Sequence, residues 1–360
     1  MTSATTNAPV VTIAGREIGP SRPPYVVAEM SGNHNGDIGR AMELMAAAAE
    51  AGADAVKLQT YTADTITIDH DGPGFTIEGG LWDGRKLHDL YGEAHTPWDW
   101  HGPLFEKGRE LGVAVFSSPF DFTAVELLER LDAPAYKIAS FEMIDLPLIE
   151  RCAATGKPLV ISTGLANKAE IDEAVAAARR GGASELIVLH CVSGYPTEPA
   201  DANIRTLIDL VDSFGVVPGL SDHTHGVAVS VAAVALGACF IEKHFTLRRA
   251  DGGPDAAFSL EPDELKGLVD GCRTAFDALG RVHYDPKGSE QGNAAFRRSL
   301  YVVADVAAGE TLTDANVRSI RPGYGLAPKH LPDVLGRAAA RALKRGDPLG
   351  WEMVEGGPPA

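Results

Sequence analysis

The chain has 360 residues, 45% of them hydrophobic, and a formal net charge of −17 at pH 7, so it can bury one large core and a second small one. The acidic balance argues against nucleic acid or an anionic membrane surface as a general partner, because both would be repelled. An anionic substrate would therefore need a local basic site.

The N-terminal segment lacks a basic stretch followed by an apolar core, so it does not resemble a secretory signal. Residues 226–241 form the longest weakly polar run, which is too short and too rich in alanine and glycine to cross a bilayer. The cysteines show no paired metal spacing and predict buried thiols rather than disulfides. These features predict a cytoplasmic protein, with no membrane and no nucleic acid among its partners.

From Pro24 onward, short β-branched runs alternate with longer helical patterns. The predicted strands cover residues 25–29, 55–59, 113–117, 135–139, 159–163, 186–190, 216–220 and 239–243. The predicted helices cover residues 37–51, 98–111, 123–131, 146–155, 168–180, 204–214, 226–236 and 262–279. This alternation predicts an α/β fold, a (β/α)₈ TIM barrel. A doubly wound open sheet is the alternative, but no Gly-rich dinucleotide loop follows any of these strands.

The connection between residues 59 and 98 is far longer than the usual loop of about two to six residues. Because it leaves the C-terminal end of a strand, we expect it to overhang the active face as a lid or pocket wall. A tolerated surface insertion is the alternative. Its aromatic residues, Phe75, Trp82 and Tyr91, favour a folded loop.

The composition changes after Leu279, where a polar linker begins. A small mixed domain follows, with predicted strands at residues 299–303 and 317–321 and a short helix near 329–335. The predicted parts are an N-terminal extension (1–22), the barrel (23–280), the linker (281–295) and a C-terminal domain (296–360). A domain of about sixty residues is near the lower limit for independent stability, so we expect it to dock against something larger.

Residues 216–246 read as a strand, a helix and a second strand, and each strand ends on a turn that carries a histidine. In a parallel sheet the two ends lie side by side, because a right-handed crossover returns the chain to the same edge. His223 and His244 could therefore share one divalent metal and leave positions open for water and substrate. In the alternative interpretation, His223 hydrogen-bonds within a capped turn and His244 is a satisfied core histidine.

Barrel enzymes place their working groups at the C-terminal ends of the strands, and here those ends are unusually polar. Lysines and hydroxyls at neighbouring strand ends can form a cradle for phosphate and carboxylate, because lysine supplies charge and serine supplies hydrogen-bond donors. The candidate residues are Glu29, Lys57, Gln59, Ser118, Lys137, Ser140, Glu142, Ser162, Ser193 and Tyr195.

Several of these candidates also have simpler interpretations. Lys57 lies within an apolar strand, where an unpaired ammonium is costly, so a functional partner is favoured. Ser118 and Ser162, taken singly, are more typical of helix caps. Lys137 and Glu142 have opposite strand parity, so both reach the mouth of the barrel only if the strand bends or ends between them.

The motifs AEMSGNHNGD, VKLQTYTADT, SSPFD, AYKIASFE, STG, HCVSGYP, GLSDHT, EKHFT and GGPDAAFSLEP resemble, in order and spacing, the sialic acid synthase superfamily. The C-terminal part, with VRSIRPGYG, is similar to the antifreeze-like (SAF, β-clip) domain of that superfamily. Within it, KIASFE, GGLWDGRKLHDLY and RSIRPGYGLAPK most resemble the pseudaminic acid synthase branch. This resemblance covers nearly the whole chain.

The resemblance implies condensation of phosphoenolpyruvate with the open-chain aldehyde of an acetamido sugar, giving a nine-carbon 2-keto acid and phosphate. For the pseudaminic branch, the sugar is 2,4-diacetamido-2,4,6-trideoxy-L-altrose. The partners implied are these two substrates and a second copy of the chain, in a domain-swapped homodimer. In this dimer, the C-terminal domain of each subunit would supply Arg321 to the barrel of the other. An exposed surface charge is the alternative interpretation of Arg321.

The resemblance also assigns roles position by position. His223 and His244 would hold a divalent metal, Mn²⁺ first, with Mg²⁺ or Co²⁺ as alternatives. Glu29 and Glu142 are the candidates for moving protons, since no serine or cysteine nucleophile is required. Phosphoenolpyruvate would be held by Lys57, Ser118, Lys137, Ser140, Ser162 and Ser221, with Ser193 near the phosphate in place of an asparagine. The sugar would face Gln59, Glu142, Tyr195, Asp255 and Arg321.

Three other activities stay open. The chain could be an N-acetylneuraminate or legionaminate synthase, acting on a different acetamido sugar. A metal-dependent barrel aldolase or isomerase would use the two histidines but not the phosphate cradle. A non-catalytic sugar-binding protein would need neither Glu29 nor Lys57 at a strand end.

Overall fold

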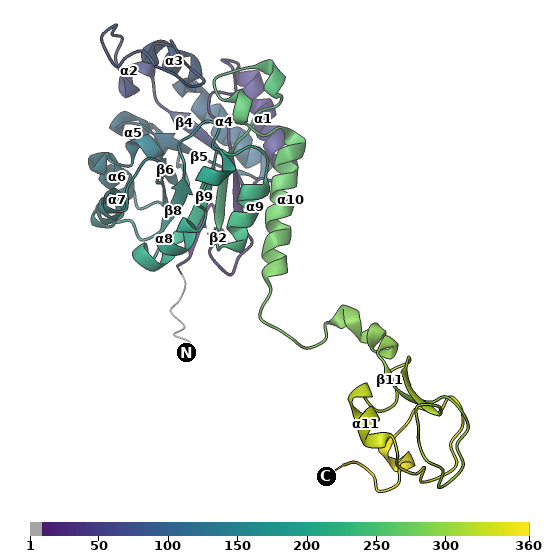
Figure 1. The fold of residues 1–360 in the computed structure, drawn as a ribbon. Helices are drawn as coiled ribbons and strands as arrows, with labels where there is room; N and C mark the ends of the chain where they lie inside the picture. The colour runs from purple at the N-terminus through teal and green to yellow at the C-terminus, as the bar shows by residue number, and fades with distance from the viewer. Residues whose placement is uncertain (1–8, 360) are drawn as a thin grey trace. The chain divides into compact units, whose positions relative to one another are not determined.

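The computed structural model describes residues 9–359, and the chain divides after Gly280 into two compact units (Figure 1). The first unit is a closed barrel of eight parallel strands in the order β10-β3-β4-β5-β6-β7-β8-β9. The predicted TIM barrel is therefore confirmed. Its strands are β3 (Tyr25–Glu29), β4 (Ala55–Thr60), β5 (Ala114–Pro119), β6 (Tyr136–Ile138), β7 (Leu159–Ser162), β8 (Leu186–Cys191), β9 (Val217–Asp222) and β10 (Phe240–His244).

Among the described residues, eight helices surround the barrel. Local chemistry sets their ends: the Asp37 side chain accepts a hydrogen bond from Gly39 N–H at the start of the first helix, and Gly52, with φ of 87°, ends it. The helices are α1 (Ile38–Ala51), α4 (Trp98–Leu111), α5 (Phe122–Arg130), α6 (Leu146–Ala153), α7 (Lys168–Arg180), α8 (Thr206–Phe214), α9 (Ala228–Ala235) and α10 (Pro262–Leu279).

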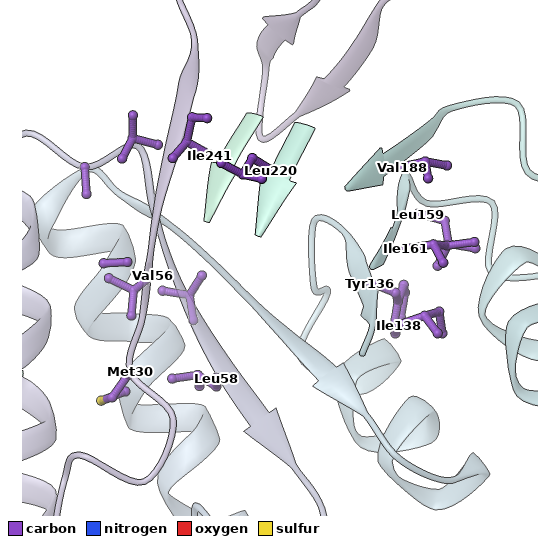
Figure 2. Packing of buried hydrophobic residues seen from close by; sticks show 14 of the residues in the cluster. Met30, Val56, Leu58, Tyr136, Ile138, Leu159, Ile161, Val188, Leu220 and Ile241 are labelled. Atoms are coloured by element: carbon purple, nitrogen blue, oxygen red, sulfur yellow. The ribbon is translucent and has the colours of Figure 1, made fainter. Parts of the chain in front are cut away.

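The strand side chains alternate between two buried layers, as a period of two requires. Those that point outward pack against the helices, and Figure 2 shows part of this layer, including Val56, Leu58, Leu220 and Ile241. Those that point inward at the N-terminal half of the barrel form a second cluster, here called the apolar plug. From the strands, its members are Tyr25, Val27, Ala55, Phe116, Val160, Ile187, Leu189, Val217 and Phe240.

An antiparallel hairpin of β1 (Val11–Ile13) and β2 (Arg16–Ile18) covers the N-terminal end of the barrel. Figure 1 shows it at the end opposite α2 (Ala63–Ile66) and α3 (Leu87–Ala94). Val11, Ile13 and Ile18 join the apolar plug. This hairpin was not predicted from the sequence, and neither were α2 and α3 within the long connection after β4.

The second unit pairs β11 (Ser299–Val302) with β12 (Val317–Ile320) in an antiparallel ladder and adds a helix, α11 (Leu331–Val334). Leu300, Val317 and Leu349 belong to its own hydrophobic core. A 3₁₀ helix, η5 (Gly288–Phe296), occupies much of the predicted linker. The other 3₁₀ turns are η1 (Ser140–Glu142), η2 (Pro199–Asp201), η3 (Arg249–Asp251), η4 (Ala256–Phe258), η6 (Pro328–His330) and η7 (Trp351–Met353). Among residues 9–359, no helix combines the length and the apolar character needed to cross a membrane.

Candidate active site

The predicted site residues continue the inward face of the strands beyond the apolar plug. On β3, Val27 belongs to the plug and Glu29 follows two residues later. On β10, Phe240 is followed at the same spacing by Glu242 and then His244. The parallel pairing aligns these positions between strands, because Glu29 is the register partner of both Lys57 and His244. The result is a polar layer at the C-terminal end of the barrel.

Two lysines and two glutamates alternate at the centre of this layer. Lys57 Nζ lies 2.5 Å from Glu29 Oε2 and 3.7 Å from Glu242 Oε1. Lys137 Nζ lies 3.5 Å from the same Glu242 oxygen. All four side chains are buried, with Lys57 only 3% exposed. Four charges of balanced sign can persist at such depth because each ammonium is next to a carboxylate.

Burial and neighbouring charges shift the pKa values of these groups in different directions. Burial raises the pKa of Glu29, and Lys57 offsets only part of that effect. Burial lowers the pKa of Lys57, but Glu242 and Glu29 together outweigh it and the net pKa is raised. Lys137 has a lowered pKa, because burial outweighs its attraction to Glu242. Lys57 is therefore a firmly charged group, whereas the Glu29 carboxyl exchanges its proton closer to neutral pH.

Glu242 was not among the predicted site residues. Burial alone would raise the pKa of this carboxyl, but Lys137 and Lys57 outweigh burial and lower it. Its Oε1 also accepts a hydrogen bond from Ser221 Oγ at 3.3 Å. The signal was present in EKHFT, because Glu242 precedes His244 by two residues and so shares its face of the strand.

A small cradle lies beside the lysines, where β6, β7 and β8 end. Gly164 N–H donates to Ser140 Oγ at 3.1 Å, and Ser162 Oγ is buried without a hydrogen-bond partner among the described residues. A methyl group at Gly164 would lie 2.1 Å from Ser193 Oγ and 2.7 Å from Ser140 Oγ. The cradle thus gathers serine hydroxyls and a backbone amide with no space for another side chain, an arrangement suited to a small anion.

The helix-cap interpretation of Ser118 and Ser162 is wrong. Asp121 caps α5 and Asn167 caps α7, each through side-chain oxygens that accept backbone N–H groups. Ser118 instead accepts a hydrogen bond from Lys57 Nζ at 3.3 Å.

The two histidines lie together, with ring centroids 5.4 Å apart. His223 Nδ1 hydrogen-bonds to Val192 O at 2.9 Å, which fixes the proton on that nitrogen and leaves Nε2 as a free acceptor. His244 Nδ1 is buried and has no hydrogen-bond partner among the described residues. The interpretation of His244 as a satisfied core histidine is therefore wrong.

This pair fits a divalent metal. Burial lowers the pKa of His244 well below its ordinary value, so this ring stays neutral as a ligand must. Burial also lowers the pKa of His223, but its contacts with Cys191 and Val192 O outweigh burial and raise it, so metal binding would have to displace any proton on its Nε2. Within the described part of the chain, no group of three or more His, Cys, Asp or Glu side chains could hold a metal. Two imidazoles would thus be the protein's contribution, with the remaining positions left for water and substrate.

A buried ion pair ties the two histidine-bearing strands together from the outward side. Lys243 Nζ lies 2.8 Å from Asp222 Oδ2, and each side chain is only 1% exposed. Asp222 Oδ1 also accepts from Thr224 N–H at 2.9 Å. Because Asp222 precedes His223 and Lys243 precedes His244, this contact sets the relative positions of the two rings.

A cavity of about 600 Å³ opens beside His244. The 3₁₀ turn at Ser140–Glu142 begins just after β6 ends, and this resolves the opposite parity of Lys137 and Glu142. Burial raises the pKa of Glu142 to about 7. The cavity is lined by the predicted sugar-facing residues Gln59, Glu142, Tyr195 and Asp255, by His244 and Ser31, and by the insert between β4 and α4.

Two contacts at this cavity, made by Ser31 and Trp82, were not predicted from the sequence. Ser31 hydrogen-bonds to Asp255, whose Oδ2 lies 3.9 Å from His244 Nδ1. Trp82, from the insert, faces Tyr195 with ring centroids 5.8 Å apart. Arg321, by contrast, belongs to the second unit, where it follows β12 and is exposed. Among the described residues, it takes part in no ion pair.

Comparisons with known proteins identify the family of this chain. The model of the NeuB family matches residues 44–284 and that of the SAF domain matches residues 297–355. Pseudaminic acid synthase from Helicobacter pylori is 44% identical, over 93% of this chain and 98% of that protein. Pseudaminic acid synthase from Campylobacter jejuni is 43% identical, over 90% and 95%.

Solved structures give the same result. The N-acetylneuraminic acid synthetase of Leptospira borgpetersenii matches with a TM-score of 0.71 at 30% identity, over 79% of this chain and 95% of that one. The Bacillus subtilis spore coat polysaccharide biosynthesis protein spsE matches with a TM-score of 0.66 at 31% identity, over 96% and 99%. By sequence and by fold, this chain belongs to the NeuB family.

Proposed function

We propose that this protein is a pseudaminic acid synthase, which condenses phosphoenolpyruvate with the open-chain aldehyde of 2,4-diacetamido-2,4,6-trideoxy-L-altrose. The C3 carbon of phosphoenolpyruvate bonds to the aldehyde carbon, whose oxygen gains a proton. Water then adds at C2 and the C–O bond to phosphate breaks. The products are a nine-carbon 2-keto sugar acid and inorganic phosphate.

One observation carries the proposal: the lysine pair, the serine cradle and the histidine pair converge at one end of the barrel, next to a cavity of sugar size. Lys57 and Lys137 would offset the charge of the phosphate and carboxylate groups. Ser118, Ser140, Ser162, Ser193 and Ser221 would donate to their oxygens, with Gly164 N–H beside them. A protein that only binds a neutral sugar has no use for such an anion site, and an aldolase would release no phosphate from phosphoenolpyruvate.

The two acidic residues would move the protons. Glu142 lines the sugar cavity and its pKa is about 7, so it is neutral often enough to protonate the aldehyde oxygen as the new bond forms. Glu29 lies beside Lys57, where phosphoenolpyruvate would bind, and its raised pKa suits a base that takes the proton of the attacking water near neutral pH. Gln59, Tyr195 and Asp255 would orient the sugar.

His223 and His244 would hold the divalent metal, for which we propose Mn²⁺, with Mg²⁺ and Co²⁺ as alternatives. When bound, the ion supplies Lewis acidity to the aldehyde oxygen. The hydrogen bond from His223 to Val192 O and the Asp222–Lys243 pair would keep the two rings in position.

The direct test measures phosphate release with both substrates and with each one alone. We expect release only with both, and a product whose mass equals the sum of the two substrates plus water minus phosphoric acid. Turnover of N-acetylmannosamine at least as efficient as that of the diacetamido sugar would transfer the assignment to another synthase of the family. A weak side activity would not, because an apolar pocket rejects one extra hydroxyl only about a hundredfold.

Metal dependence is tested separately. Chelation should abolish turnover, and His223→Ala or His244→Ala should remove bound metal while the protein stays folded. His330→Ala, in the second unit, is the matched control and should keep both metal and activity. Full turnover by a metal-free preparation would contradict the metal assignment.

We further propose a cytoplasmic homodimer, because phosphoenolpyruvate is a cytoplasmic metabolite and Arg321 is an exposed cation with no ion-pair partner among the described residues. Arg321 would then serve the sugar site of the partner subunit. Mixing His244→Ala with Arg321→Gln tests this by complementation. Random pairing would return about a quarter of wild-type activity, whereas a mixture that stays inactive would assign Arg321 to its own barrel. Full activity of Arg321→Gln alone would assign Arg321 to no site.

A further inference from the structure

Residues 75–87 of the insert form an ordered hairpin, here called the lid hairpin. Thr76 and Lys86 pair as an antiparallel bridge, and Ile77 N–H donates to Arg85 O at 2.9 Å. Near the tip, Arg85 N–H donates to Trp82 O at 3.0 Å. These bonds hold the backbone of the hairpin in one conformation and present Trp82 from its tip.

Trp82 joins the lid hairpin to the opposite side of the cavity. Its indole Nε1 donates to Pro254 O at 2.9 Å, and its ring lies against Tyr195. Pro254 precedes Asp255, which Ser31 holds beside His244. A single indole hydrogen bond therefore connects the insert to the loop that carries a proposed sugar ligand.

The wall that the lid hairpin gives to the cavity is apolar. Ile77, Gly79, Gly80 and Leu81 line the cavity without a single side-chain hydrogen-bonding group. The indole N–H of Trp82 is already used by Pro254. A hydroxyl pressed against this wall would lose hydrogen bonds to water and find no side-chain partner there in return.

Two large apolar side chains at this cavity remain open to solvent. Leu81 on the lid hairpin is 48% exposed, and Phe141, which also lines the cavity, is 58% exposed. Apolar groups exposed within a pocket mark surface that a ligand covers. Methyl groups would gain from this burial, and an acetamido sugar carries them.

We propose that the lid hairpin is the specificity wall of the sugar pocket: it accepts methyl substituents in preference to hydroxyls, and Trp82 is the positioning residue that holds it against Pro254. The identification of the ligand as an acetamido sugar rests on the proposed function. The role of Trp82 in holding the lid hairpin against Pro254 does not depend on the proposed function.

The closure is tested with Trp82→Phe, which keeps an aromatic ring and removes the indole N–H. Trp98→Phe is the matched control, because Trp98 Nε1 donates to Tyr61 O at 3.3 Å and Trp98 is not part of the cavity lining. Trypsin can cut the lid hairpin after Arg85 and Lys86. We expect Trp82→Phe to speed this cleavage about fivefold, the effect of one lost hydrogen bond on an opening equilibrium, and Trp98→Phe to leave it unchanged.

In turnover assays, Trp82→Phe should raise the KM for the sugar about fivefold while the KM for phosphoenolpyruvate and kcat stay within twofold. A general loss of structure would change all three constants together. Equal cleavage rates and equal sugar KM values for Trp82→Phe and Trp98→Phe would overturn the role of Trp82.

The selectivity is tested with Leu81→Ser, which places a hydroxyl on the wall. Two sugars that differ only by a methyl or a hydroxymethyl group at C5 are compared by kcat/KM. We expect the preference for the methyl sugar to fall about tenfold in the variant, and an unchanged ratio would overturn the apolar-wall assignment. If the wild type releases no phosphate with any sugar, the proposed function fails, and the cleavage comparison still decides whether Trp82 holds the hairpin.

Discussion

The interior of the barrel holds two layers built by the same strands, and their chemistry is opposite. In the lower layer, the apolar plug, inward positions carry residues such as Val27, Phe116 and Phe240. In the upper layer, the next inward positions carry Glu29, Ser118 and Glu242, all buried. On these three strands, the apolar residue of the plug and the polar residue of the upper layer are only two positions apart.

This difference indicates that the lower layer stabilises the fold and that the upper layer carries its function. The plug gains free energy from buried apolar surface, at roughly 25 cal/mol per Å². The upper layer buries charges that each need a partner, so it adds little net stability and becomes fragile when one member is removed. Substitutions in the two layers should therefore fail in different ways, and four experiments test this contrast.

The largest effect is expected for Lys57→Met. It removes the cation between Glu29 and Glu242 and leaves two buried carboxylates facing each other. Phosphate release should fall at least about a thousandfold, and urea unfolding should show a loss of about 3–5 kcal/mol. Lys157→Met, which breaks an exposed pair with Asp132, is the control and should change both phosphate release and the free energy of unfolding only slightly. A Lys57→Met protein with a tenth of normal activity would contradict the role of the charged layer.

Phe116→Ala should give the reverse pattern. Phe116 is fully buried in the plug, so its truncation should cost about 3–5 kcal/mol in urea unfolding. Both KM values of the folded protein should stay within twofold. Phe122→Ala, at a half-exposed position on α5, should be near neutral in stability. A rise in KM for phosphoenolpyruvate would mean that the two layers are not independent.

Gly164→Ala probes the upper layer without touching a charge. The added methyl group would meet Ser193 Oγ and Ser140 Oγ inside van der Waals distance, so we expect the KM for phosphoenolpyruvate to rise about a hundredfold. Adding Ser193→Ala should recover part of the loss by removing one clash. Gly267→Ala, where a methyl group meets nothing within 4 Å, is the control. Unchanged affinity in Gly164→Ala would exclude the cradle as the anion site.

The smallest effect concerns pH. Burial raises the pKa of Glu142 from 4.5 to about 7, so between these values the folded protein keeps a proton that the unfolded chain has lost. Its contribution to stability is present below pH 4.5 and is lost as the pH rises through 7. Glu142→Gln should flatten this part of the curve of unfolding free energy against pH. An identical slope in both proteins would contradict the raised pKa.

The barrel and most of its site could be predicted because alternation is a local signal. All eight barrel strands were found, since each carries β-branched residues bounded by turns. The β1–β2 hairpin was missed although Ala14 and Gly15, both with positive φ, form a two-residue turn between Ile13 and Arg16. Strands of three residues give too short a pattern to recognise without their partner.

The rest of the site depends on contacts that no local pattern encodes. Glu242 could have been found by strand parity with His244. The contact between Trp82 and Pro254 joins residues 172 positions apart. The helix α2 has only four residues, too few for a periodic signal, and α3 begins without a side-chain cap to mark its start. The partnerless nitrogen of His244 likewise follows only from its surroundings, because the same residue could be satisfied in another core.

The depth of Lys57 and Lys137 also governs how an anionic substrate arrives. With a formal net charge of −17, the protein as a whole repels phosphoenolpyruvate at long range, and a Debye length of about 8 Å at physiological salt confines the attraction of two buried ammonium groups to the last stage of entry. The capture of substrate is therefore a short-range event. The long-range repulsion should make the association rate slow for a small anion. Because added salt should weaken the outer repulsion more than the inner attraction, this rate should not fall steeply as ionic strength increases.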